Sequence, residues 1–102
     1  VTLTHSKTKN LSEETKRADF LFVAAGKPHL IDASYVSAGS IVIDVGIHRD
    51  AGGKILGDVK FDEVSKIVKA ITPVPGGVGP MTLWGLMDNV LISAENRTKI
   101  KK

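Results

Sequence analysis

Cysteine is absent from this chain of 102 residues. Its absence excludes disulfide bonds, thiol catalysis and a cysteine-bound metal, and it fits a reducing compartment. The three histidines, His5, His29 and His48, show none of the i, i+2 or i, i+4 spacings typical of metal sites. We therefore expect no metal.

Long apolar runs are absent too. None approaches the roughly 20 residues that a membrane-spanning helix needs, and the N-terminus lacks the pattern of a signal or transit peptide. With 42% apolar and 25% charged residues, the chain is expected to form at most one soluble globular domain with a modest core. The net charge of +3 can assist the binding of an anionic ligand such as a dinucleotide.

Glycine and proline, in contrast, are concentrated in one stretch, I-T-P-V-P-G-G-V-G-P-M-T, from Ile71 to Thr82. Pro73 and Pro75 fix their own φ and favour extended backbone before them. The glycines permit positive φ and let another molecule approach the main chain, and Pro80 suits the first position of a helix. We expect a ligand at this loop, facing the positive end of that helix. The alternative is a strand-to-helix corner that binds nothing.

The apolar pattern predicts an α/β fold. Continuous apolar runs indicate buried strands at Phe20–Ala25 and Ser40–Gly46, and helical spacing indicates an amphipathic helix beginning near Phe61 and a last helix from about Pro80 to Arg97. The other expected elements are a strand at Val1–His5, a helix from about Ser12 to Arg17 with Asn10 or Ser12 as N-cap, a helical turn at Asp32–Val36, a hairpin arm at Lys54–Val59 and a strand at Ala70–Thr72. This order predicts a Rossmann-like, mostly parallel sheet with helices on both faces.

The sequence resembles a known family over nearly its whole length. P-G-G-V-G-P-M-T, Pro75–Thr82, is similar to the C-terminal signature of the bifunctional methylenetetrahydrofolate dehydrogenase/methenyltetrahydrofolate cyclohydrolase family, although members usually place Ile or Val where this chain has Leu83. Shorter fragments agree in the same order: H-S-K-T at His5–Thr8, G-K-P at Gly26–Pro28, V-I-D-V-G-I at Val42–Ile47 and G-D-V at Gly57–Val59.

The resemblance implies an NADP-dependent enzyme of one-carbon metabolism and purine biosynthesis. It would oxidise 5,10-methylenetetrahydrofolate to the methenyl form and hydrolyse that product to 10-formyltetrahydrofolate. The family is expected to act as a homodimer in the cytoplasm, or in mitochondria of a eukaryote. A tetrahydrofolate-type substrate is the expected partner; no membrane or nucleic acid is expected.

A dinucleotide-binding fold opens with a glycine-rich phosphate turn, and no G-x-G-x-x-G lies near Val1. The family places its own dinucleotide motif just before the strand expected at Val1–His5, and a catalytic domain with a tyrosine and a lysine before that. We therefore expect residues 1–102 to be the C-terminal part of an NADP-binding domain, incomplete at the N-terminus. Alone it should be inactive, and no residue of this chain is expected to be catalytic.

Ligands of open parallel sheets bind at the carboxyl ends of the strands. After Val1–His5 the chain has Ser6, Lys7 and Thr8, at the place where NAD-binding folds usually carry an acidic residue. The hydroxyl groups and the lysine favour the 2′-phosphate of NADP, which an acidic residue would repel. By resemblance Ser6 contacts that phosphate, although an ordinary turn hydroxyl is the alternative. The other expected cofactor contacts are Gly26 and Ile47, the latter holding the nicotinamide end through its main chain. The expected folate-binding residues are Pro73, Val74, Pro75, Gly76, Gly77, Val78, Gly79 and Pro80.

Some other residues are expected to serve the structure. Asp44 should make a structural hydrogen bond near the ligand cleft, Asp58 should order a loop, and Tyr35 and Trp84 should pack in the core. The rival function is a non-catalytic basic α/β module that binds a nucleotide or nucleic acid through the lysines at positions 7, 9, 99, 101 and 102. These lysines lack interleaved aromatics and any recognised motif.

Overall fold

Three short parallel strands form the sheet of the computed structural model, which describes residues 1–100. β1 (Phe20–Val23), β2 (Ile41–Asp44) and β5 (Ala70–Ile71) lie in the order β1-β2-β5. The central β2 pairs in parallel with both neighbours, with Phe22 opposite Ile43 and Val42 opposite Ile71. The predicted parallel α/β arrangement is confirmed, with strands shorter than expected.

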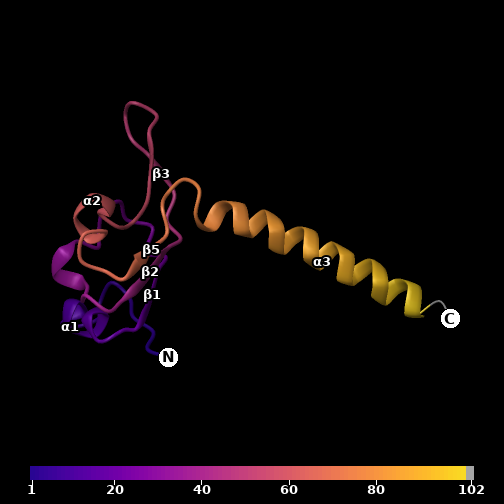
Figure 1. Cartoon of the computed structure of the whole chain (residues 1–102), viewed down its shortest axis with the longest axis horizontal. Coiled ribbons are helices and arrows are strands. Elements are labelled where there is room, and N and C mark those ends of the chain that lie inside the picture. Colours follow the sequence, from indigo (N-terminus) through magenta and orange to yellow (C-terminus); the bar gives the residue numbers. More distant parts are fainter. Residues whose placement is uncertain (101–102) are drawn as a thin grey trace.

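A two-stranded antiparallel hairpin extends from the body (Figure 1). It consists of β3 (His48–Arg49) and β4 (Ile55–Leu56), with His48 opposite Leu56. The Asp50 carboxylate closes its turn by accepting hydrogen bonds from the backbone N–H groups of Gly52 and Lys54, both at 2.9 Å. The hairpin arm predicted within Lys54–Val59 is thereby confirmed.

Short helices and connecting segments cover one face of the sheet. α1 (Leu11–Lys16) follows the N-cap Asn10, the 3-10 helix η1 (Ala33–Tyr35) is the predicted helical turn, and α2 spans Phe61–Val64. The buried core consists of Val23, Ile31, Val36, Val42, Val59 and Val64, with Tyr35 packed against it as predicted. On the opposite face of β1, Phe20 and Phe22 are 60% and 69% exposed, so within residues 1–100 the expected helical cover exists on one face.

Asp32 caps η1. Its carboxylate accepts hydrogen bonds from the hydroxyl and the backbone N–H of Ser34. These bonds favour the charged carboxylate and lower the pKa of Asp32 below its ordinary value. The group serves the local turn and is not among the predicted site residues.

The last helix, α3 (Val78–Ile100), projects away from the body (Figure 1). It begins two residues before the predicted start, so Pro80 is its third residue, still in the first turn where a missing N–H breaks no helical hydrogen bond. Trp84 is 65% exposed, which corrects its assignment to the core. Exposed apolar side chains continue along the helix: Met81, Leu83, Leu86, Met87, Val90, Leu91 and Ile92. Within the described residues, no helix combines the length and the apolar character that crossing a bilayer requires.

Two predicted elements differ from the structure. Residues 1–5 form no strand, because a strand needs a hydrogen-bonded neighbour and none pairs with this segment in the described chain. Val1 and Leu3 are accordingly exposed. The amphipathic helix is reduced to the single turn of α2, after which the N–H groups of Ile67 and Val68 both bond the Val64 carbonyl and the chain turns toward β5.

The burial of Val64 provides a test of this core. Val64 is fully buried, whereas Val45 is 40% exposed. Val64→Ala should lower the free energy of unfolding by roughly 2 kcal/mol, since it removes two buried carbon atoms and leaves a cavity. The matched Val45→Ala should cost less than about 1 kcal/mol. Denaturant titration of the protein measures both, and equal losses would contradict the assignment of the core.

Candidate functional site

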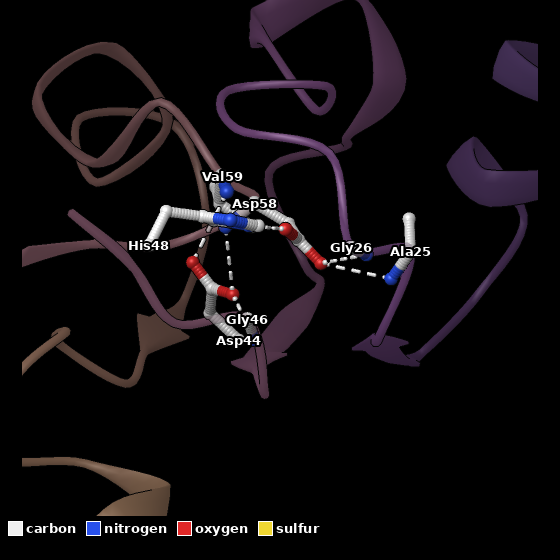
Figure 2. A network of polar contacts seen from close by, with 7 residues as sticks. All are labelled: Ala25, Gly26, Asp44, Gly46, His48, Asp58 and Val59. Atoms are coloured by element: carbon white, nitrogen blue, oxygen red, sulfur yellow. Dashed lines mark hydrogen bonds and ion pairs between the residues drawn. The ribbon is translucent and has the colours of Figure 1, made fainter. Parts of the chain in front are cut away.

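The carboxyl end of β2 is organised by the buried carboxylate of Asp44, which is 4% exposed. One oxygen accepts hydrogen bonds from the backbone N–H groups of Gly46 at 2.9 Å and Asp58 at 3.1 Å, and the other accepts from Val59 at 3.0 Å (Figure 2). The predicted structural role of Asp44 is confirmed. The carboxylate joins the segment after β2 to the segment after β4.

A second buried carboxylate, that of Asp58, lies beside it and is fully buried. Its Oδ2 accepts hydrogen bonds from Ala25 N–H at 2.8 Å and Gly26 N–H at 3.1 Å, and its Oδ1 lies 2.6 Å from Nε2 of His48 (Figure 2). The predicted loop-ordering role of Asp58 is confirmed. His48 was not predicted as its partner, because the sequence gives no sign that side chains ten residues apart converge across a hairpin.

Glycine is needed at two positions around these carboxylates. A Cβ built on Gly46 would collide with the carboxylate of Asp58, and one built on Gly57 would collide with that of Asp44. Main chain and carboxylate therefore pack in direct contact at both places. This contact explains the glycines of V-I-D-V-G-I and G-D-V through internal packing.

The loop after β5 starts from the same strand end. The Thr72 hydroxyl accepts a hydrogen bond from the backbone N–H of Asp44 at 2.9 Å, which fixes the beginning of the Pro73–Pro80 segment against β2. Within the loop, Gly76 has φ +100° and the Val74–Pro75 peptide bond is cis. A Cβ on Gly77 would collide with the Pro73 carbonyl oxygen and lie 2.9 Å from Cβ of Thr72.

The glycines of this loop thus serve different purposes. The missing side chain of Gly77 is required by the loop's own packing, whereas a Cβ on Gly79 would meet nothing within 4 Å. The sequence predicts the same role for all of these glycines, that of letting a ligand approach the backbone. The geometry assigns open space to Gly79 and internal contact to Gly77.

A cleft of about 550 Å³ lies between this loop and the segment after β2. It brings together Ile47, which is 66% exposed, and all eight predicted folate-binding residues, Pro73 to Pro80. Val45, Gly46, Ile55 and Leu83 complete much of its mainly apolar wall. A volume of this size suits a small organic ligand or part of a larger one.

The other predicted cofactor residues lie outside this cleft. Ser6 and Lys7 are exposed on a turn held by two bonds between His5 and Thr8: Thr8 N–H to the His5 carbonyl at 3.0 Å and His5 N–H to the Thr8 hydroxyl at 2.8 Å. Gly26 is exposed with φ +68°, and its N–H is occupied by Asp58. Gly26 can therefore offer a ligand its Cα and its carbonyl group.

Among residues 1–100, no group of three or more His, Asp or Glu side chains could hold a metal ion. The lysines proposed for nucleic-acid binding lie on different elements. Lys7 and Lys9 shortly precede α1 in the chain, whereas Lys99 is in the last turn of α3, which projects away from the body (Figure 1). Lys101 and Lys102 lie outside the described residues. The described lysines of the rival interpretation are therefore divided between two parts of the chain.

The chain is similar to known proteins that share one name, the bifunctional protein FolD. The chain is 60% identical over 95 residues to the bifunctional protein FolD of Lachnoclostridium phytofermentans, covering 93% of this chain and 34% of that protein. It is 59% identical over 88 residues to FolD of Streptococcus sanguinis, covering 86% and 31%. The chain thus spans about a third of the length of the curated relatives it matches.

Solved structures agree. A crystal structure of the FolD methylenetetrahydrofolate dehydrogenase/cyclohydrolase from Campylobacter jejuni superimposes with a TM-score of 0.91 at 54% identity, covering 94% of this chain and 34% of that one. The Trypanosoma brucei FolD complexed with NADP and an inhibitor gives a TM-score of 0.79 at 39% identity, covering 88% and 33%. These neighbours confirm the Rossmann-like fold.

The family model described as tetrahydrofolate dehydrogenase/cyclohydrolase, NAD(P)-binding domain, matches residues 1–98. The match includes the strand ends, both buried aspartates and the loop that borders the cleft. The chain therefore belongs to the tetrahydrofolate dehydrogenase/cyclohydrolase family and matches the model of its NAD(P)-binding domain.

Proposed function

We propose that this chain acts as the C-terminal part of the NADP-binding domain of a bifunctional methylenetetrahydrofolate dehydrogenase/methenyltetrahydrofolate cyclohydrolase. The observation that carries the proposal is the cleft in which Ile47 and the Pro73–Pro80 loop face each other. The parallel sheet places that cleft at strand ends, where α/β folds bind ligands. A preceding catalytic domain, outside this chain, supplies the acid and base in this proposal.

The cofactor is proposed to be NADP, bound along the strand ends. The Trypanosoma brucei relative is complexed with NADP. In this chain the exposed Ser6 hydroxyl and Lys7 ammonium group are both donors, and the His5–Thr8 turn contains no carboxylate that would repel a 2′-phosphate. These residues fit the phosphate of NADP. Thr8, Gly26 and the main chain of Ile47 are the other proposed contacts.

The substrate is proposed to be a tetrahydrofolate carrying a one-carbon unit, held against Pro73–Pro80. When bound, NADP supplies the hydride acceptor for oxidation of the methylene group. The role of this chain is to bind and orient the cofactor and the substrate. Ile47 and the loop border the cleft on two sides, and the apolar wall of the cleft excludes water from the hydride transfer. Proton transfer and hydrolysis of the methenyl product are assigned to the preceding domain.

We also propose that the complete enzyme is a cytoplasmic homodimer, as the family resemblance implies. Light scattering on the purified protein measures the oligomeric state. A monomer at micromolar concentration would contradict this part of the proposal.

The 2′-phosphate assignment predicts a change in cofactor choice. In the full-length enzyme, Ser6→Asp should raise the ratio of the NADP to the NAD dissociation constant by roughly tenfold or more, because a fixed negative charge would face the phosphate. Ser6→Ala should have a smaller effect, since it removes one donor without adding charge. Ala38→Asp is a matched charge control, because residue 38 precedes β2 and lies toward the amino ends of the strands. Calorimetric titration with both dinucleotides measures the ratio, and an unchanged ratio in Ser6→Asp would remove Ser6 from the site.

The open space at Gly79 predicts a substrate effect that is separate from stability. Gly79→Leu should raise the KM for the folate substrate by about tenfold, equivalent to ~1.4 kcal/mol, while the NADP dissociation constant and the melting temperature stay nearly unchanged. Gly39→Leu is the control, since a Cβ there also meets nothing within 4 Å, while residue 39 is far from the loop in sequence and does not line the cleft.

Gly77→Ala should behave differently from Gly79→Leu. Its Cβ would collide with the Pro73 carbonyl, so the loop must shift and the melting temperature should fall together with activity. Steady-state kinetics and thermal melting of the same preparations separate the two variants. A normal folate KM in Gly79→Leu would show that the substrate does not lie against this loop.

A further inference from the structure

The network around Asp58 connects two of the three segments to which the proposed function assigns the cofactor: the residues that follow β1 and those that follow β2. Oδ2 of Asp58 accepts hydrogen bonds from Ala25 and Gly26, which follow β1. Oδ1 contacts Nε2 of His48, which follows Ile47 directly. Figure 2 shows the Asp58 carboxylate between the two segments, with His48 on one side and the Ala25–Gly26 backbone on the other. One buried side chain thus spans both of these segments.

The chemistry of this contact defines the role of each group. An ionised carboxylate only accepts hydrogen bonds, so His48 presents Nε2–H to Asp58 as a donor. A fully buried carboxylate is stable only when its oxygens are hydrogen-bonded, and the two backbone donors both go to Oδ2. The His48 ring supplies the contact to Oδ1 and thereby fixes the rotation of the carboxylate. The ring is mostly buried, with 19% of the side chain exposed, so its own orientation is restrained.

The residues on either side of Ile47 are also held by backbone contacts. Gly46 lies against the same carboxylate so closely that it has no room for a Cβ. Its N–H is bonded to Asp44, and the His48 backbone is paired with Leu56 across the hairpin. Ile47 therefore lies between two residues that are each held in place. Its side chain is 66% exposed and lines the cleft, and the hydrogen bonds of the network do not involve it.

From this geometry, and resting on the proposed function, we propose that His48 is a positioning residue for the nicotinamide half of the dinucleotide. It acts through Asp58, by fixing the Gly46–His48 segment relative to the Ala25–Gly26 loop. Loss of the link lets the Ile47 main chain move at the edge of the cleft. The adenosine half, proposed to bind the His5–Thr8 turn, does not depend on this link, because that turn is held by its own hydrogen bonds.

The test uses the full-length enzyme and two probes, NADP and adenosine 2′,5′-bisphosphate, which lacks the nicotinamide half. His48→Ala should weaken NADP binding by about tenfold and lower kcat, while the dissociation constant of adenosine 2′,5′-bisphosphate changes less than about twofold. His48→Gln should recover most of the NADP affinity, since its amide places an N–H donor near the position of Nε2. Asp58→Asn is unsuitable as the main variant, because it alters a fully buried group on which folding itself can depend.

His29→Asn is the matched control, a histidine replaced outside the network. His29 is exposed with φ +55°, a conformation that Asn tolerates, and it does not line the Ile47 cleft. NADP binding should be unchanged in this variant. Melting curves of His29→Asn and the unaltered enzyme should agree closely. His48→Ala should melt lower, because it leaves Oδ1 of the buried Asp58 carboxylate without its partner, so the two probes are compared within each variant.

The outcomes separate the inference from the function on which it rests. The positioning role is wrong, while the proposed function stands, if His48→Ala weakens the binding of both probes equally or leaves NADP binding unchanged. It is also wrong if His48→Gln binds NADP no better than His48→Ala. If the unaltered enzyme binds neither probe, the proposed function itself fails and the inference fails with it.

Discussion

The structure depends on the burial of two carboxylates at the ends of its parallel strands. Asp44 is 4% exposed and Asp58 fully buried, and a buried charge is tolerated only when hydrogen bonds replace the lost water. Here the donors are mostly backbone N–H groups of loops that would otherwise lack partners. The same bonds therefore stabilise the charges and shape the loops. Two short side chains thus hold together strand ends that are far apart along the chain.

This arrangement links the core to the proposed site. The core below is a small set of aliphatic residues, mainly valine, which cover one face of a three-stranded sheet. So small a core gives limited rigidity to long loops by itself. The carboxylate network and the Asp44–Thr72 bond fix the segments after β2, β4 and β5 against one another. The cleft between Ile47 and the Pro73–Pro80 loop is thus shaped by the backbone of these segments.

Much of this could be predicted from the sequence, and the exceptions share a cause. The parallel strands, the glycine loop and the last helix follow from local pattern, because apolar runs, prolines and glycines act within a few residues. Whether residues 1–5 form a strand and whether Trp84 is buried both depend on which segments pack beside them. The periodicity of the sequence does not specify those neighbours. The His48–Asp58 contact and the packing of Gly77 on Pro73 depend on side chains and carbonyls that only the folded hairpin and loop bring together.

The central claim is that the loops held by Asp44 and Asp58 form one face of an NADP site that ends at the folate cleft. A crystal structure of the full-length protein with NADP tests it most directly. We predict the 2′-phosphate within hydrogen-bonding distance of Ser6 and Lys7, the nicotinamide at the main chain of Ile47, and the His48–Asp58 contact unchanged at about 2.6 Å. A dinucleotide bound away from these strand ends, or a nicotinamide outside the cleft bordered by Pro73–Pro80, would contradict the account.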